Sequence, residues 1–450
     1  MTGGSTKRSL AVICAIGAVV RIVYVLVFRA DVPLGGGDAY AYSAGADLLA
    51  AGRGFVEPLS VLSGHPAGTA NHPPLYMLWL TVASVVDPGH TTSPTVHMLW
   101  SCVPGVGTVL LCGLIGRRLA GERAGLIAAA VAAVYPNLWF HDGMLLSETM
   151  AAFTIALTLY ASYRFWDRPT AGRVAWLGVC CGLAALSRPE LALTVPVLLV
   201  PLVLMMRVPP LRQRLKLVAL GGLASIAVIS PWVAYNNSRF DAPVYLSTNA
   251  GGASAAANCD STYYGVLIGY KDYACSERTY DRLAARTPDW DELDIAQKDQ
   301  LARNEVSHYI RDHAKRLPVV MAARIGRLLK LYGVRQEMRY DTDVHTHEPW
   351  VVRSGLLSWY VLAPLAVAGA VTLRRRRELL YPLVAVPALV LAAVALTFAQ
   401  TRYRAPAEPA IAILAAVALE AAWAKHRREP SPAAAETDDD TSPTAVPVDA

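Results

Sequence analysis

Runs of about twenty mostly apolar residues recur along the chain, and each is long enough to cross the roughly 30 Å hydrocarbon core of a bilayer as a helix. About ten such runs can be delimited. They cover approximately residues 10–28, 95–116, 124–141, 148–165, 173–188, 190–206, 215–234, 354–373, 379–399 and 405–424. This pattern predicts an all-α polytopic membrane protein with about ten transmembrane helices.

Two long segments, 29–94 and 236–353, interrupt the apolar runs. In the first, DAYAYSAGADLLAAG and HPPLYMLWLTVASVV are predicted to be short helices that lie at the membrane interface. In the second, residues 291–316 alternate in charge at helical spacing, which predicts a helix within a small subdomain. The predicted division is an amino-terminal transmembrane module (1–235), the subdomain (236–353), carboxy-terminal helices (354–428) and a disordered acidic tail (429–450).

Basic residues concentrate in alternate short loops, from Lys7 and Arg8 before the first run to the block Arg374 to Arg377. Cytoplasmic loops collect lysine and arginine, so both termini are predicted to be cytoplasmic and both long segments extracytoplasmic, in a multi-pass protein of the cell membrane. The formal net charge of +6 is attributed to the basic residues of these predicted cytoplasmic loops. The sequence shows no basic cluster with interleaved aromatic residues of the kind that would indicate nucleic-acid binding.

Composition supports a membrane protein, because 54% of the residues are hydrophobic and only 17% are charged. Most of the seven cysteines fall in apolar runs, where cysteine usually packs as a small hydrophobic residue. Cys259 and Cys275 instead share the second outer segment, where an oxidising environment predicts a disulfide. Two free thiols are the alternative.

The stretch LGGGDAYAY places one carboxylate, Asp38, at the exit of the first apolar run, between three glycines and two tyrosines. Glycines permit a close approach to a ligand, and Tyr40 and Tyr42 offer aromatic faces and hydroxyls for substrate binding. A carboxylate at the lipid–water boundary can take a proton from an acceptor hydroxyl, which makes Asp38 a candidate general base. Helix capping is the simpler alternative.

Further polar residues lie at the predicted outer ends of the runs. ANHPPLY supplies His72, and HDGMLLSE supplies Asp142 and Glu148 as candidates for substrate binding. TRYRAPAEP supplies Arg402 and Arg404, whose position on the outer face suits an anionic ligand such as a phosphate. His72 could also be a turn residue without a role in binding, and Glu148 could stabilise the first turn of a helix.

Taken in order, GDAYAYSAGADLLAAGRGF, HPPLY, LSE, LSRPE, PWVAYNNSRF, YLSTNAGG and RYRAPAEP resemble bacterial members of the GT-C superfamily of glycosyltransferases. The resemblance is strongest to the group with protein O-mannosyltransferases and the lipid A aminoarabinose transferase. It implies the GT-C fold and an inverting transferase that moves a sugar from a polyprenyl-phosphate donor in the bilayer. The acceptor would be a glycan, lipid or protein on the extracytoplasmic face.

The resemblance also implies roles for single residues. Asp38 matches the first-loop carboxylate that acts as general base or positions the acceptor. Arg402 and Arg404 match a basic motif and become candidates for binding the donor phosphate, while Glu148 matches an acidic residue that contacts sugar or acceptor.

Two departures from the family pattern affect these roles. Ala39 follows Asp38 where some relatives carry a second acid, and His72 stands where relatives often carry lysine. Phosphate binding by His72 would then require its protonated form, below about pH 6.5. No cofactor is required by the resemblance, although a divalent metal ion assists some members, and His72, Asp142 and Glu148 could supply ligands.

Two other classes of protein share some of these features. A transporter or flippase of a lipid-linked sugar or another anion would place ionisable residues near the middle of several spans. In this sequence the ionisable residues gather at the outer ends instead, which favours an enzyme. An O-antigen-type polymerase or ligase would leave the first-loop Asp38 unexplained.

Overall fold

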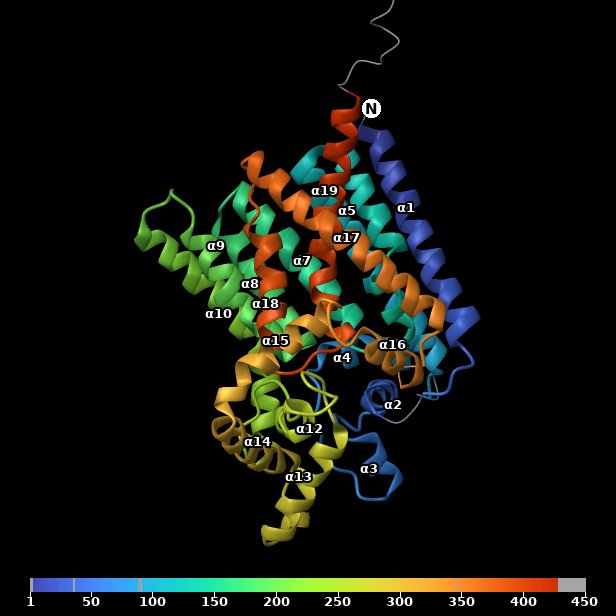
Figure 1. Cartoon of the computed structure of the whole chain (residues 1–450), viewed down its shortest axis with the longest axis vertical. Helices are drawn as coiled ribbons and strands as arrows, with labels where there is room; N and C mark the ends of the chain where they lie inside the picture. The colour runs from blue at the N-terminus through green and yellow to red at the C-terminus, as the bar shows by residue number, and fades with distance from the viewer. Residues whose placement is uncertain (1–2, 35–36, 88, 90, 345, 428–450) are drawn as a thin grey trace, which may run out of the picture.

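The computed structural model describes residues 3–34, 37–87, 89, 91–344 and 346–427, which form helices joined by loops (Figure 1). Within these residues the β pairing is limited to one antiparallel bridge between Val56 and Gly68. The predicted all-α architecture is therefore confirmed. The predicted tail at 429–450 lies outside the described residues, as do Gly35 and Gly36 of the glycine run.

Each predicted apolar run falls on helical structure. The bundle consists of α1 (Gly3–Tyr24) with a π-helical extension (Val25–Arg29), α5 (Pro94–Val134), α7 (Glu148–Asp167), α8 (Ala171–Ser187), α9 (Val200–Leu204), α10 (Leu211–Asn237), α17 (Pro349–Arg375), α18 (Tyr381–Leu396) and α19 (Glu408–His426). Helix α5 covers run 95–116 and most of run 124–141, with a break at Ala120 and Gly121. Short helical turns, Pro136–Trp139 and Phe140–Gly143, follow it.

Five helical segments of the described chain are long and apolar enough to cross a membrane. They are Ser5–Arg29, Pro94–Val134, Leu211–Asn237, Pro349–Arg375 and Thr401–His426. Among the other predicted runs, α8 and α18 are shorter, and run 190–206 is divided into short turns before α9. The chain is a multi-pass membrane protein, and the ten crossings stay a prediction.

Glycines allow the closest contacts between the helices of the bundle. A Cβ atom on Gly178 of α8 would lie 2.0 Å from the carbonyl oxygen of Gly221 on α10. A Cβ atom on Gly369 of α17 would lie 1.9 Å from the carbonyl oxygen of Leu414 on α19. Any larger residue at these positions would force the helices apart, as expected where small residues line the contacts between membrane helices. Helix α19 is buried from Glu408 to Ala418 and forms the centre of the bundle.

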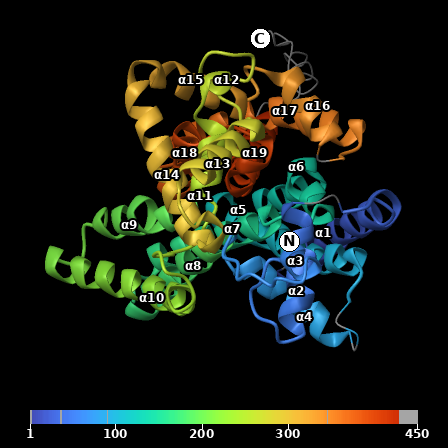
Figure 2. The same cartoon turned by 90° about the horizontal axis from the view of Figure 1, so that it is seen from below.

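The two long segments gather at one end of the bundle, opposite to the amino end of α1 (Figures 1 and 2). The first contains α2 (Asp38–Ala50), α3 (Pro58–Leu62) and α4 (Leu75–Val86). The second contains α11 (Ala250–Ala257), α12 (Asp260–Tyr263), α13 (Tyr273–Arg286), α14 (Ile295–Asp312), α15 (Leu317–Leu328) and α16 (Val334–Asp343). Helices α2, α4 and α14 thus form where the sequence predicts helices.

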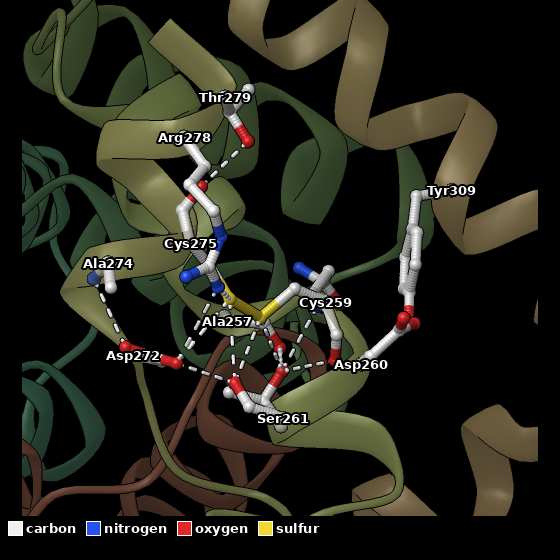
Figure 3. The surroundings of a disulfide bond; sticks show 12 residues. Ala257, Cys259, Asp260, Ser261, Asp272, Ala274, Cys275, Arg278, Thr279 and Tyr309 are labelled. Atoms are coloured by element: carbon white, nitrogen blue, oxygen red, sulfur yellow. Dashed lines mark hydrogen bonds and ion pairs between the residues drawn. A yellow bond between two sulfur atoms is a disulfide. The ribbon is translucent and has the colours of Figure 1, made fainter. Parts of the chain in front are cut away.

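A disulfide between Cys259 and Cys275 closes the segment that joins α12 to α13 (Figure 3). Inside the closed segment, the Ser261 hydroxyl donates to Asp272 Oδ2 at 2.7 Å, and Asp272 Oδ1 accepts from the backbone N–H of Ala274 at the start of α13. These contacts hold the ends of the segment together. Lys271, which lies next to Asp272 in this segment, approaches Phe398 with its Nζ 5.6 Å from the ring centroid.

Candidate active site

A cavity of about 400 Å³ lies between the bundle and the two long segments. Its polar wall combines side chains from distant parts of the sequence: Asp38, His72, Glu148, Arg188 and Arg402. An apolar wall comes from α18 and the residues after it, with Val390, Val394 and Phe398. Residues of the second long segment, including Tyr245, Asn249 and Arg303, complete the lining. A volume of this size accommodates a small ligand.

Asp38 lies at the first turn of α2 because Gly37 adopts φ 105°, a left-handed conformation that glycine accepts easily. Its Oδ2 accepts hydrogen bonds from both terminal nitrogens of Arg402 at 3.2 Å, and its Oδ1 lies 3.4 Å from His72 Nε2. Burial acts to raise the pKa of Asp38. The contact with His72 and the charge of Arg402 outweigh burial and hold this pKa well below its usual range. The side chain is still 37% exposed.

Glu148 lies behind Asp38, at the first residue of α7, and is almost fully buried. Its Oε1 accepts from Arg188 Nη1 at 3.0 Å and lies 3.5 Å from Arg402 Nη1. Arg188 also contacts Glu190 through Nε at 2.7 Å, so it joins the start of α7 to the turn that follows α8. Among the described residues, Glu148 Oε2 has no hydrogen-bond partner. Arg402 thus bridges the two carboxylates of the cavity.

Tyr42 lines the cavity and is stacked on His72, with ring centroids 4.7 Å apart. The ring of Tyr76 meets Tyr42 edge to face, and its hydroxyl hydrogen bonds to Ser101 Oγ at 2.8 Å. This stack fixes His72 beside Asp38. Tyr40 lies on the same helix but is absent from the described residues that line the cavity.

Asp142 and Arg404 lie away from this cavity, in buried ion pairs of the bundle. Asp142 Oδ2 lies 2.9 Å from Arg21 Nε, and Asp142 Oδ1 accepts from the Thr149 hydroxyl at 2.7 Å. Arg404 contacts Glu408 Oε1 at 2.5 Å, and its guanidinium stacks on the ring of Trp359 at 3.7 Å from the centroid. Each of these two side chains already has charged and polar partners inside the protein.

A buried lysine near the site was not anticipated from the sequence. Lys271 is 5% exposed, donates to the Tyr273 hydroxyl, and lies 5.6 Å from the ring centroid of Phe398. Burial, together with the positive charge of Arg402, lowers its pKa to about 7. Its neighbours in GYKDY give no periodic pattern or motif, so no sequence signal marks this lysine.

The short helical turn Thr401–Ala407, which carries Arg402, is held by a second buried network. Lys330 Nζ contacts Glu337 Oε2 at 2.9 Å and also the hydroxyl of Thr401. Glu337 Oε2 and Asp341 Oδ2 lie 2.8 Å and 3.0 Å from that hydroxyl. Because Thr401 immediately precedes Arg402, these contacts anchor the turn at the cavity.

Among the described residues, the acidic and histidine side chains of the cavity do not by themselves form a cluster that could share a metal ion. Oδ2 of Asp38 and Oε1 of Glu148 are both occupied by guanidinium groups. In the described part of the chain, the one cluster of three potential ligands close enough to share an ion is Cys259, Asp272 and Cys275. These two cysteines are bonded to each other and offer no thiolate. No chemical step is therefore derived through a metal.

Comparisons with known proteins agree with this architecture. Residues 71–235, less than half of the chain, match the family described as dolichyl-phosphate-mannose-protein mannosyltransferase. No curated protein matches the chain. Several solved structures do, although at low sequence identity.

One solved structure is the archaeal oligosaccharyltransferase AglB from Archaeoglobus fulgidus, in complex with an inhibitory peptide and a dolichol-phosphate. It is 16% identical to this chain, with a TM-score of 0.55, and the match covers 97% of this chain and 52% of the AglB chain. The same enzyme with zinc and sulfate gives 18% identity and a TM-score of 0.53, over 92% and 50%. A third, ArnT from Cupriavidus metallidurans bound to undecaprenyl phosphate, gives 15% identity and 0.45, over 96% and 82%.

The chain spans about half the length of the AglB structures that it matches. Nearly all of this chain is nevertheless covered, so the bundle and the two long segments both fall within the match. The chain is therefore a polytopic membrane protein with the fold of the GT-C superfamily of glycosyltransferases.

Proposed function

We propose that this protein is a membrane glycosyltransferase that transfers a sugar from a polyprenyl-phosphate donor to the hydroxyl of an acceptor. The bridge from Arg402 to Asp38 and Glu148 carries the proposal, because it places a strong cation between two carboxylates in one cavity. The family match names a dolichyl-phosphate-linked sugar, and AglB was solved with a dolichol-phosphate. Both are lipid phosphates of the kind proposed here.

Arg402 is the proposed ligand of the donor phosphate. Its guanidinium is 12% exposed at the cavity, and a guanidinium can donate two parallel hydrogen bonds to phosphate oxygens. The apolar wall with Val390, Val394 and Phe398 would receive the first isoprene units of the lipid. His72 stands beside Asp38 and, when protonated, would add a second positive charge.

The proposed reaction is a single displacement. The acceptor oxygen forms a bond to C1 of the sugar while the bond from C1 to the phosphate oxygen breaks. Asp38 takes the proton of the acceptor hydroxyl, and the departing phosphate takes the electron pair and is stabilised by Arg402. Attack from the face opposite to the phosphate inverts the configuration at C1, and no covalent enzyme intermediate is needed.

The ion pair with Arg402 also suggests an order of binding. While Asp38 holds Arg402 and contacts His72, its low pKa makes it a weak base. A donor phosphate that draws Arg402 away would remove one cause of this low pKa and strengthen Asp38 as a base. We therefore expect the donor to bind before the acceptor.

The remaining predicted residues take supporting roles in this proposal. Glu148 and Tyr42 line the cavity and are the proposed contacts for sugar or acceptor. Asp142 and Arg404, which are paired inside the bundle, would support the fold and not touch the substrates. The proposal keeps both termini in the cytoplasm and the cavity on the outer face, with a glycan, lipid or protein as acceptor. A divalent ion is optional.

A donor-release assay tests the proposal. The purified protein in lipid nanodiscs would be incubated with a panel of radiolabelled polyprenyl-phosphate sugars and acceptor extracts, and released polyprenyl phosphate would be counted. Asp38→Asn should lower turnover by about 100-fold or more while donor binding is kept. Asp31→Asn, a change of an exposed carboxylate in the same segment, is the matched control. Donor binding without release in any extract would instead support a transporter of lipid-linked sugars.

A further inference from the structure

A second cavity, of about 470 Å³, lies at the other end of the bundle from the candidate active site. Helix α7 connects the two places, since Glu148 at its start lines the first cavity and Asp167 at its end lines the second. The helix has 20 residues, so the cavities are separated by roughly 30 Å. The second cavity is lined by Leu114, Ile115, Tyr160, Tyr163 and Asp167 together with Arg117, Arg118, Arg164, Arg168 and Arg173.

Two of these arginines hold the walls together. Arg118 Nη2 contacts Asp167 Oδ1 at 2.7 Å, and Arg118 Nη1 contacts Glu378 Oε2 at 2.9 Å, which links α5, α7 and the turn before α18. Arg173 Nη1 donates to the backbone carbonyl of Arg164 at 2.6 Å and so ties the start of α8 to the end of α7. These contacts fix the walls of the cavity, so its shape does not depend on unconstrained surface side chains.

The other arginines leave positive charge without compensation. Arg117 and Arg168 are exposed, and within the described part of the chain neither has an ion pair or a side-chain hydrogen bond. Arg164 reaches only the hydroxyl of Tyr160, at 3.2 Å. Basic residues scattered along a loop would satisfy the topology of a membrane protein equally well. Their convergence on one open concavity needs a separate explanation, because like charges brought together repel each other.

We propose that this cavity binds the phosphate group of an anionic phospholipid from the adjacent leaflet. Basic pockets between transmembrane helices at a membrane surface bind anionic lipid head groups, and guanidinium groups suit phosphate oxygens. Leu114, which is partly exposed, adds an apolar edge next to the arginines, along which an acyl chain can lie. A soluble anion has no acyl chain to pack against this apolar edge. The site is separate from the cavity of the proposed transferase and does not depend on its activity.

Delipidated protein in detergent provides the test. The thermal unfolding midpoint would be followed during titration with dioctanoyl phosphatidylglycerol, dioctanoyl phosphatidylcholine or inorganic phosphate. We expect a saturable stabilisation by phosphatidylglycerol alone. At about 1 kcal/mol per arginine near the membrane surface, the double variant Arg117→Gln with Arg168→Gln should bind it roughly 30-fold more weakly. Arg207→Gln with Arg212→Gln changes two exposed arginines, one in the turn between α9 and α10 and one in the first turn of α10, and should bind like the wild type.

Three results would overturn the proposal. The first is that phosphatidylcholine stabilises the protein as much as phosphatidylglycerol does. The second is that inorganic phosphate does so, which would assign the cavity to a soluble anion. The third is that the Arg117 and Arg168 variant binds phosphatidylglycerol with unchanged affinity. Native mass spectrometry of the wild type gives a check that needs no variant. Phosphatidylglycerol should stay bound at a collision energy that strips phosphatidylcholine, and its loss at the same energy would also contradict the proposal.

Discussion

Arg402 donates hydrogen bonds from both terminal nitrogens to Oδ2 of Asp38 at 3.2 Å, although 364 residues separate the two in the sequence. The same guanidinium lies 3.5 Å from Glu148. Two carboxylates that would otherwise repel each other in a partly buried cavity therefore share this cation. Any anion that binds Arg402 must compete with these carboxylates, so the strength of this bridge controls the affinity of the site for its substrate.

Removal of this bridge should weaken the binding of the donor. In Arg402→Ala we expect KM for the polyprenyl-phosphate sugar to rise roughly 10- to 100-fold, the range for loss of hydrogen bonds to a charged group. Steady-state kinetics with varied donor would measure the change. Arg335→Ala, which removes an exposed arginine of α16, is the control and should keep the wild-type KM. An unchanged donor KM in Arg402→Ala would exclude the proposed role of Arg402 in phosphate binding.

Arg404 should behave differently, because it is paired with Glu408 inside the bundle. Arg404→Met leaves Glu408 as a buried charge without its partner, which should destabilise the protein by about 3–5 kcal/mol. The thermal unfolding midpoint should fall in this variant and recover in part in the double variant Arg404→Met with Glu408→Leu. If Arg404→Met instead keeps the wild-type midpoint and has a raised donor KM, Arg404 binds the donor phosphate.

Lys271 should make stability depend on pH. Its pKa is about 7 in the folded protein and about 10.4 in an unfolded chain, so the unfolded chain binds more protons between these values. Stability should therefore rise with pH across this window, by about 1 kcal/mol per pH unit relative to Lys271→Met. Unfolding midpoints of both proteins between pH 7 and 10 would measure the difference.

Lys315→Met, which changes an exposed lysine of the same long segment, controls for the general effect of removing a charge. Its unfolding midpoints should follow those of the wild type at every pH. If Lys271→Met also follows the wild type over the whole range, Lys271 is charged in the folded protein at neutral pH and the explanation from burial fails.

The disulfide between Cys259 and Cys275 should protect the segment that contains Lys271. A bridge that closes about 15 residues contributes on the order of 3 kcal/mol. The double variant Cys259→Ser with Cys275→Ser should lower the unfolding midpoint and speed proteolysis between α12 and α13. Cys14→Ser, a free and partly exposed cysteine of α1, is the control. Equal proteolysis of the wild type with and without a reducing agent would show that the bridge has no such effect.

Local patterns were sufficient to predict most of the helices. Helices α2 and α14 form where helical spacing predicts them, because that spacing depends on neighbours three and four residues apart. Helix α4 forms where a short apolar run after two prolines predicts an interfacial helix. The break of α5 at Ala120 and Gly121 shows where two predicted runs meet within one helical segment. The roles proposed for Asp38 and Arg402 rested on motifs, and the structure brings these two residues into one cavity.

The sequence by itself determined that this is a helical membrane protein with charged residues at one mouth of its bundle, because hydrophobic length and local charge need no knowledge of packing. Only the tertiary structure decided which of those charges meet. Arg402 and Arg404 are two residues apart on a helical turn, so their side chains point in different directions. Arg404 pairs with Glu408 four residues further along the same helical stretch, whereas Arg402 reaches Asp38 on α2, a partner that only the packing of distant segments brings close.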